Sequence, residues 1–263
     1  MRLGGHDLTL GYDGRVIAQD LTVEIPDRSF TVVVGPNACG KSTLLRALAR
    51  VLRPRSGTVL LDGQDIHKRP ARAVARTLGL LPQSSTAPDG ITVADLVSRG
   101  RYPYQGLLRQ RSADDERVVT EAMEATGVLD LARSPVDELS GGQRQRVWIA
   151  MALAQQTSLL LLDEPTTFLD IAHQIEVLDL CARLHLAEGR TLVAVLHDLN
   201  QAARYATHLI AMRDGRVVAA GDPLSVVTAD LVEEVFGLPS RVIPCPETGT
   251  PLVIPKASSV RVA

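Results

Sequence analysis

The first quarter of the chain alternates short apolar runs with turn residues, a pattern that predicts β-strands. The predicted strands are Leu8–Leu10, Val16–Ile17, Leu21–Ile25, Phe30–Val34 and Thr58–Leu61. Turns are expected at Asp13-Gly14, Pro26-Asp27 and Asp62-Gly63, because these residue types accept the backbone angles of tight turns. An apolar stripe predicts one helix in this region, from Lys41 to about Leu52.

From about Ser84 to Gln156 the pattern changes from strand to helix. Ser112 is expected to cap one helix of this block, and Gly127 is expected to end it. Apolar strands resume after the block, at Leu159–Leu162, Thr191–Leu196 and Leu209–Met212. Alternating strands and helices predict an α/β fold, with a mostly parallel sheet covered on both faces and residues 84–156 inserted as a helical lobe.

Composition narrows the possible function classes. The chain has 263 residues, of which 45% are apolar, and a formal net charge of −2. It can therefore bury a sizeable core, but it lacks the basic balance that nucleic-acid binding requires, so we expect no nucleic-acid partner. Arg101, Arg109 and Arg111 form one local basic cluster, which we interpret as a solvated face.

Cysteine usage and hydropathy bear on the cellular compartment. Cys39, Cys181 and Cys245 are odd in number and lack metal-binding spacing, which favours a reducing compartment. Residues Met1–Gly14 lack the apolar core of a signal peptide, and no window approaches eighteen consecutive apolar residues. We therefore expect any membrane role to come through a partner.

The segment Gly35-Pro36-Asn37-Ala38-Cys39-Gly40-Lys41-Ser42-Thr43 has the G-x-x-x-x-G-K-[ST] spacing of a phosphate-binding loop, and it joins a predicted strand to a predicted helix. Gly35 and Gly40 allow consecutive backbone N–H groups to surround a phosphate chain. Lys41 is expected to neutralise the β- and γ-phosphates of ATP, and the Ser42 hydroxyl to ligate Mg²⁺. Cys39 is either a small filler in this loop or a thiol activated by the helix dipole.

Two acidic residues, Asp163 and Glu164, follow the four-leucine strand. In open parallel sheets ligands bind at the carboxyl ends of strands, where the phosphate loop is also expected. Asp163 is placed to hold Mg²⁺, and Glu164 to orient and deprotonate the attacking water.

The segment Leu139-Ser140-Gly141-Gly142-Gln143 precedes a predicted helix. Ser140 and Gln143 have the spacing of a capping box, which would explain the segment locally. Two glycines at the first helical positions cost helix stability, however, and leave bare N–H groups that suit an anion. We interpret the segment as a second phosphate clamp, and with it the chain resembles a nucleotide-binding domain of an ABC transporter.

The resemblance covers about Leu8 to Gly237. It implies a P-loop cassette over residues 1–238 with an N-terminal antiparallel β portion. Beyond Pro239, prolines and short apolar pairs predict a minor β appendage or a tail over residues 239–263, without an assigned role. The resemblance also implies that Tyr12 stacks on adenine and that Gln83 approaches Mg²⁺ and the attacking water. Asp170 occupies the D-loop position near the nucleotide, and His197 would hydrogen-bond the γ-phosphate.

For the assembly, the resemblance implies a head-to-tail dimer in which each ATP lies between the phosphate loop of one chain and Ser140–Gly142 of the other. The second chain is another copy or a paralogous ATPase. The implied partners are transmembrane permease subunits and, indirectly, a substrate-binding lipoprotein. The expected location is the cytoplasmic face of the cell membrane, as a peripheral subunit.

The segment Gly100-Arg101-Tyr102-Pro103-Tyr104-Gln105-Gly106 resembles importers of ferric siderophores, haem and cobalamin. Packing on its own lobe and contact with a permease are both open for this segment. Iron-siderophore import is the first expectation, and haem or cobalamin import is the second. A soluble ABC ATPase is less favoured, since the chain shows no second cassette, coiled coil or basic face. An exporter cassette would usually be fused to membrane helices.

Overall fold

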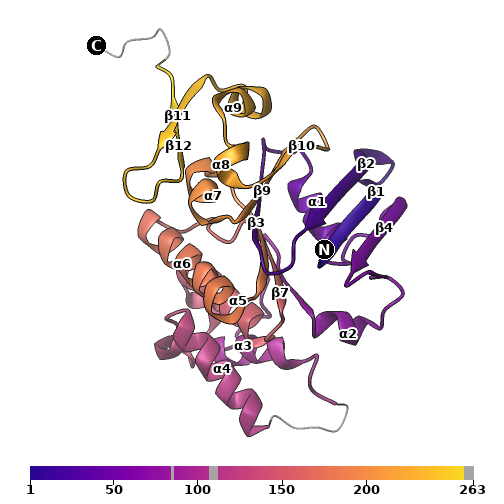
Figure 1. Cartoon of the computed structure of the whole chain (residues 1–263). Helices are drawn as coiled ribbons and strands as arrows, with labels where there is room; N and C mark the ends of the chain where they lie inside the picture. The colour runs from indigo at the N-terminus through magenta and orange to yellow at the C-terminus, as the bar shows by residue number, and fades with distance from the viewer. Residues whose placement is uncertain (84–85, 107–111, 258–263) are drawn as a thin grey trace. The chain divides into compact units, whose positions relative to one another are not determined.

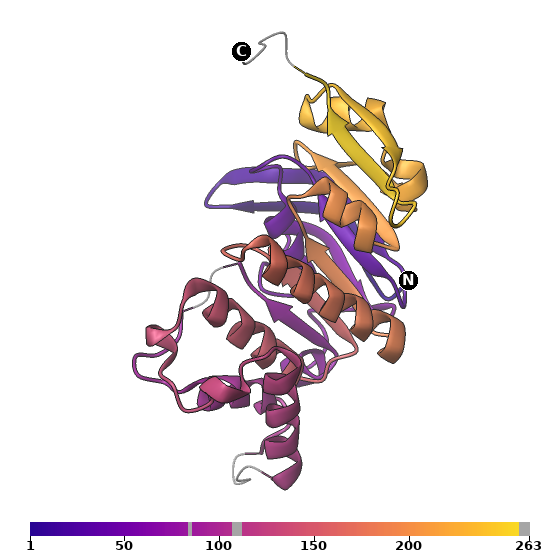
Figure 2. The same cartoon turned by 90° about the vertical axis from the view of Figure 1, so that its left-hand side faces the viewer.

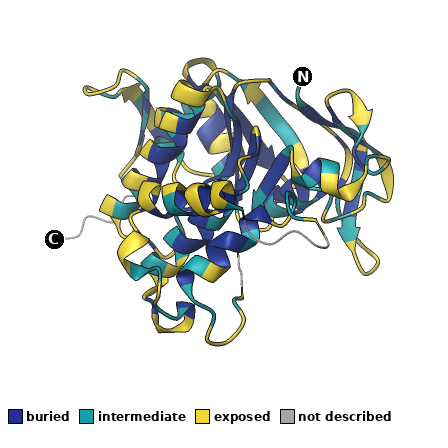
Figure 3. Ribbon diagram, turned by 90° about the horizontal axis from the view of Figure 1, so that it is seen from below, coloured by how far each residue is buried: buried dark blue, intermediate teal, exposed yellow. Residues whose placement is uncertain are grey.

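The computed structural model describes residues 1–83, 86–106 and 112–257. The chain divides into two compact units. The first combines Met1–Asp65 with Val193–Ala263, and the second is Ile66–Leu192. Each unit contains a strand that is buried at every residue, whereas the helices show buried and exposed bands (Figure 3).

The first unit begins with a four-stranded antiparallel sheet in the order β2-β1-β4-β5. Its strands are β1 (Leu3–Tyr12), β2 (Arg15–Ile25), β4 (Ser56–Leu61) and β5 (Gln64–Asp65). β1 and β2 are longer than the apolar pattern predicts, because shifts in their register let them continue past polar positions. The predicted turn at Asp13-Gly14 joins them, and both of its residues have positive φ.

A second group of strands in this unit carries the phosphate loop. β3 (Phe30–Val34) is buried at every position and pairs in parallel with β9 (His208–Arg213), which in turn pairs antiparallel with β10 (Arg216–Gly221). α1 (Lys41–Leu48) follows β3. The prediction that this helix continues to Leu52 was wrong, because Arg50 adopts a left-handed φ of 64° that ends the helical backbone.

The last part of the first unit contains three helices and a hairpin. The helices are α7 (Leu199–Tyr205), α8 (Pro223–Val226) and α9 (Ala229–Phe236). The hairpin consists of β11 (Ser240–Pro244) and β12 (Pro251–Pro255), and it packs against α7 and α9 (Figure 1). Residues 240–255 of the segment beyond Pro239 therefore form a β-hairpin, which agrees with the predicted minor β appendage.

The second unit contains two parallel strands and the helical lobe, which Figure 2 shows in magenta. The strands are β6 (Leu78–Leu81) and β7 (Leu159–Asp163), and β8 (Thr191–Val195) begins at the end of this unit. The helices are α2 (Ala71–Ala75), α3 (Val93–Ser98), α4 (Ala113–Ala125), α5 (Gly141–Ala154) and α6 (Ile171–Glu188). α3, α4 and α5 pack against one another. Ser112 caps α4 in a complete capping box, as the sequence predicts.

The interpretation of Arg101 as part of a solvated face was wrong. Its side chain is 4% exposed, and its guanidinium donates to Asp115 at 2.8 Å and to the Ala154 carbonyl at 3.0 Å. It also lies over the Tyr104 ring at 4.2 Å from the centroid. Burying this cation is possible because a carboxylate and a carbonyl satisfy it inside the lobe. Arg109 and Arg111 lie outside the described residues.

The same network shows what most of the Gly100–Gly106 segment does. The Tyr104 hydroxyl donates to the Gln155 carbonyl at 2.9 Å, so this tyrosine also packs within the lobe. Tyr102 is different, because it is 58% exposed. Packing therefore accounts for Arg101 and Tyr104, and leaves Tyr102 as the aromatic of the segment that faces outward. Within residues 1–83, 86–106 and 112–257, no helix combines the length and apolar character of a membrane crossing.

The buried Arg101–Asp115 ion pair leads us to a prediction about the free energy of unfolding. Asp115→Asn should lower the free energy of unfolding by about 3–5 kcal/mol at pH 7, since it leaves Arg101 buried without a counter-charge. Burial opposes ionisation of Asp115, but hydrogen bonds from Arg101 and Ser112 outweigh it and hold the pKa of this carboxyl below its ordinary value. The stabilisation is thus present above the unfolded pKa of about 3.9 and is lost as pH falls through the lower folded pKa.

Urea unfolding of the wild type and the variant between pH 7 and pH 3.5 checks this prediction. The gap between the two proteins should begin to narrow below about pH 4, and a gap that stays constant down to pH 3.5 would contradict the assignment. Asp114→Asn is the control, because Asp114 forms an exposed pair with Arg117 at 2.6 Å. That variant should cost less than about 1 kcal/mol.

Candidate functional site

The phosphate loop has a backbone that only glycine permits at its ends. A Cβ atom on Gly35 would lie 2.2 Å from the Met212 carbonyl oxygen, so no side chain fits there. Gly40 has a φ of 105° and is the N-cap of α1, and no side chain caps this helix. The first N–H groups of α1 therefore face the loop without a side-chain acceptor, which is the arrangement of a phosphate site.

Lys41 places a positive charge inside this loop. Its side chain is 5% exposed, and its ammonium donates to the carbonyls of Gly35 and Pro36 at 2.8 Å each. The first turn of α1 contains no acidic residue that could compete for the ammonium. The cation is thus held at the open end of the helix, where it would add to the attraction of the backbone N–H groups for an anion.

Cys39 is buried in the loop, with 5% exposed. Burial raises the pKa of its thiol, and the opposing effect of the nearby Lys41 ammonium is smaller. Burial and this direction of the pKa shift favour the filler role over an activated thiol. Cys181 is buried in α6, where burial raises its pKa to about 12.

Tyr12 and His197 lie in the same unit as the phosphate loop. Tyr12 ends β1, is 39% exposed, and its hydroxyl accepts a hydrogen bond from Arg46 of α1 at 3.3 Å. The sequence analysis missed Arg46, although its spacing of four residues from Ser42 places both on one face of α1. His197 follows Leu196, whose N–H donates to the Val33 carbonyl of β3 at 3.2 Å.

Asp163 and Glu164 lie in the second unit, at the end of β7. Both are buried, with 1% and 9% exposed. Glu164 has a left-handed φ of 55°, a conformation that is strained for a residue with a side chain. Its carboxylate accepts a hydrogen bond from the Thr167 hydroxyl at 3.2 Å, so Thr167 helps to orient it. The sequence analysis gave Thr167 no such role.

The Ser140 segment forms the capping box that its spacing predicts. The Ser140 hydroxyl oxygen accepts from the Gln143 N–H at 3.2 Å, and the Gln143 side chain accepts from the Ser140 N–H at 3.0 Å. Gly141 and Gly142 occupy the first two positions of α5, where an α-helix offers no carbonyl to their N–H groups. The box therefore uses the hydroxyl as an acceptor and leaves its proton and two N–H groups for an anion.

Gln83 lies close to this helix start. It follows Pro82 after β6, and it lines a hollow of about 300 Å³ together with Gly141, Gln145 and Phe168. Gln145 donates to the Pro165 carbonyl at 3.1 Å, which connects α5 to the turn that follows Glu164. The second unit thus brings Gln83, the Ser140 segment and the Glu164 turn together.

Asp170 begins α6 as its N-cap. Its carboxylate accepts from the His173 backbone N–H at 2.9 Å, and this hydrogen bond lowers the pKa of Asp170. Just before it, Phe168 is 79% exposed and has a φ of 67°. The D-loop residues therefore form an exposed turn, in which Asp170 has a structural role that the sequence analysis did not assign.

Oxygen atoms dominate the side chains predicted to hold a metal, which are the Ser42 hydroxyl, the Asp163 carboxylate and the Gln83 amide. Oxygen donors of this kind suit Mg²⁺. Among the described residues, no group of three His, Cys, Asp or Glu side chains could hold a metal ion.

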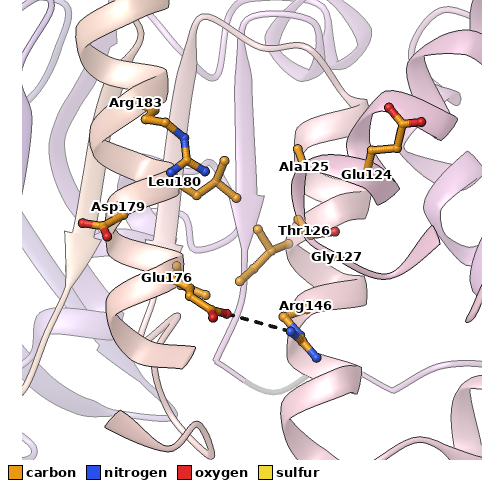
Figure 4. A pocket seen from close by; sticks show the side chains of 11 residues that line it. Glu124, Ala125, Thr126, Gly127, Arg146, Glu176, Asp179, Leu180 and Arg183 are labelled. Atoms are coloured by element: carbon orange, nitrogen blue, oxygen red, sulfur yellow. Dashed lines mark ion pairs between the residues drawn. The ribbon is translucent and has the colours of Figure 1, made fainter. Parts of the chain in front are cut away.

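Another hollow of the second unit, of about 330 Å³, contains none of the predicted site residues. It lies between α6 and the helices α4 and α5, and Arg146 and Glu176 from its two walls form an ion pair at 4.0 Å (Figure 4). Its lining mixes charges of both signs with apolar side chains, so it indicates no particular ligand.

Comparisons with known proteins agree with these motifs. A profile of the family described as ABC transporter matches residues 18–167. The chain is 57% identical over 254 residues to the ferric enterobactin transport ATP-binding protein FepC of Escherichia coli (strain K12), covering 97% of this chain and 94% of that protein. It is 46% identical over 252 residues to the iron(3+)-hydroxamate import ATP-binding protein FhuC of Bacillus subtilis (strain 168), covering 96% and 94%.

Solved structures agree as well. A chain of an inward-facing ABC transporter assigned to the metal-chelate type matches with a TM-score of 0.82 and 28% identity, covering 97% of both chains. A dimeric bacterial ABC transporter cassette matches with a TM-score of 0.76 and 25% identity, covering 84% of this chain and 98% of that one. The fold prediction, an α/β cassette with an inserted helical lobe, is confirmed. The chain belongs to the ABC transporter family and is one of its ATP-hydrolysing cassettes.

Proposed function

We propose that this chain is the ATP-hydrolysing subunit of a ferric-siderophore importer. The observation that carries the proposal is the identity of 57%, over 97% of the chain, with a ferric enterobactin transport ATP-binding protein. The relative that handles iron(3+)-hydroxamate supports the same class of cargo, a chelate of iron(III). The importer's permease and binding lipoprotein would supply the cargo site, and this chain would supply the energy.

The first unit binds the triphosphate. The uncapped start of α1 and the Lys41 ammonium attract the β- and γ-phosphates, and the ammonium exchanges a loop carbonyl for a phosphate oxygen. Tyr12, held by Arg46, offers an exposed ring face for adenine. His197 hydrogen-bonds the γ-phosphate and so responds to its loss.

The second unit carries out the hydrolysis. Glu164 accepts a proton from the attacking water, and Thr167 holds the carboxylate in place. Mg²⁺ would be held by Ser42 and Asp163, with Gln83 near it, and would neutralise phosphate charge when bound. The buried position of Asp163 limits its freedom and so favours a fixed metal site.

The Ser140–Gln143 segment serves a second copy of the chain. Its open N–H groups and the Ser140 hydroxyl proton would contact the γ-phosphate bound by the partner, with Asp170 at the same seam. A related cassette has been solved as a dimer, which supports this arrangement. Closure of the dimer on ATP and reopening after cleavage would drive the permease subunits, with this chain on the cytoplasmic face of the membrane.

Glu164→Gln tests the hydrolysis step. The amide cannot accept the proton, so kcat should fall by about 10²–10⁴-fold while ATP binding persists, and the dimer should accumulate with ATP bound. Phosphate release and light scattering measure these effects. Glu188→Gln, which changes an exposed carboxylate paired with Arg190, is the control. Unchanged phosphate release in Glu164→Gln would reject the role of Glu164.

Ser140→Ala tests the clamp, and the chain offers a matched control. Both Ser140 and Ser112 cap a helix through a complete capping box, so either alanine variant should cost about 1 kcal/mol of stability. Only Ser140→Ala should also abolish ATP-dependent dimerisation. Each serine variant is combined with Glu164→Gln, so that ATP is not consumed, and analytical ultracentrifugation measures the dimer. Equal dimerisation of both variants would show that Ser140 is a helix cap alone.

Cargo is tested in the host organism. Deleting the gene for this chain should block uptake of a radiolabelled iron siderophore and leave uptake of haem and cobalamin unchanged. Complementation with the wild type should restore uptake, whereas the Glu164→Gln variant should not. Normal siderophore uptake in a deletion strain that lacks redundant ATPases would count against the proposed cargo.

A further inference from the structure

The Asn200 side chain of α7 is hydrogen-bonded to the C-terminal hairpin. The Asn200 amide nitrogen donates to the Val253 carbonyl at 3.3 Å, and the Val253 N–H donates to the Asn200 amide oxygen at 2.7 Å. Val253 is 7% exposed, so both hydrogen bonds are shielded from water at their hairpin end. A side-chain amide thus pairs with both polar groups of one backbone residue, as a neighbouring strand would.

The register of the hairpin explains why the N–H and C=O of Val253 are both available to hydrogen-bond Asn200. The Cys245 N–H donates to the Thr250 carbonyl, and the Lys256 N–H to the Pro239 carbonyl, so these are hydrogen-bonded pairs of the ladder. Bonded pairs alternate along an antiparallel hairpin, so Val253, paired with Val242, is a position whose N–H and C=O point away from β11. Pro251 and Pro255 occupy equivalent positions on β12, where a proline costs no ladder bond.

Asn200 lies three residues after His197, and the segment between them is held at both ends. Before His197, the Leu196 N–H donates to β3, the strand that leads into the phosphate loop. After it, the Asp198 carboxylate accepts from the N–H groups of Asn200 and Gln201 at 2.8 and 2.9 Å, and so caps α7. His197 is exposed, and its backbone direction is fixed by these neighbours.

We propose that Asn200 is a positioning residue for ATP hydrolysis, and that the hairpin of β11 and β12 braces the His197 segment through it. The inference rests on the proposed role of His197 at the γ-phosphate. The hairpin then has a function in the catalytic cycle, since a shift of β12 would be transmitted through Asn200 to the start of α7 and to His197. Displacing a catalytic group by about 1 Å can cost up to about 10²-fold in rate.

Steady-state ATP hydrolysis by the full chain tests the proposal. Asn200→Ala should lower kcat by about ten- to a hundredfold and change KM for ATP by less than about twofold, because the phosphate loop supplies ground-state binding. Asn200→Asp keeps an acceptor for the Val253 N–H but loses the donor, and should recover part of kcat. A loss confined to thermal stability, with kcat unchanged in both variants, would overturn the proposal.

Thr248→Ala is the matched control in the same hairpin. It removes the contact between the Thr248 and Thr250 hydroxyls at 2.7 Å, at the turn and away from Asn200, and should leave kcat unchanged. Val253→Pro removes the N–H that donates to the Asn200 amide oxygen and leaves the residues of α7 unchanged, so it should reproduce the kcat loss. If Asn200→Ala does not fold, the kcat of Val253→Pro tests the proposal in its place.

His197→Ala distinguishes the proposed role of His197 at the γ-phosphate from the proposed positioning of His197 by Asn200. If turnover persists in that variant, the proposed role of His197 fails. If His197→Ala is inactive while Asn200→Ala and Val253→Pro keep full kcat, the role of His197 stands and the brace is wrong.

Discussion

Backbone N–H groups at the start of a helix are the constraint on which the site depends. α1 and α5 both begin with groups that no carbonyl can satisfy, and both have glycine at or next to that start. The first helix lacks any side-chain cap, whereas the second has a capping box that covers one N–H group and leaves two. An anion would complete both helix starts, and the proposed triphosphate would then be bound in part by peptide groups that folding has already oriented.

Local patterns explain how much of this was predictable from the sequence. The phosphate loop, the Ser112 and Ser140 caps and the four-leucine strand are each encoded within fewer than ten consecutive residues, and all are present in the structure. Their chemistry depends on backbone angles and helix ends that neighbouring residues determine. The end of α1 was mispredicted because the pattern of apolar residues does not reveal that Arg50 adopts a left-handed φ, which ends the helix.

Contacts between distant segments could not be predicted in this way. Arg101 is buried because Asp115 and the Ala154 carbonyl reach it from α4 and α5, and neither partner is visible in the sequence near residue 101. Arg46 beside Tyr12 and Asn200 beside Val253 are further cases, separated by 34 and 53 residues. From composition alone, polar side chains of this kind are expected to be solvated, and only the fold shows that they hold other residues in place.

The two interpretations of the Ser140 segment are compatible, and their combination has a physical consequence. A capping box alone would stabilise α5 equally well with alanine at Gly141 and Gly142, since helix propensity favours alanine by up to about 1 kcal/mol per residue. A Cβ atom at Gly142 would lie 3.3 Å from Leu169, and one at Gly141 would lie 3.7 Å from Phe168. The fold could accept a Cβ atom at Gly142 with small shifts and one at Gly141 without any, so packing alone does not require glycine at either position. Under the proposed clamp role, glycine leaves the N–H groups open to an incoming phosphate, and the lower helix propensity of glycine would be the cost of that access.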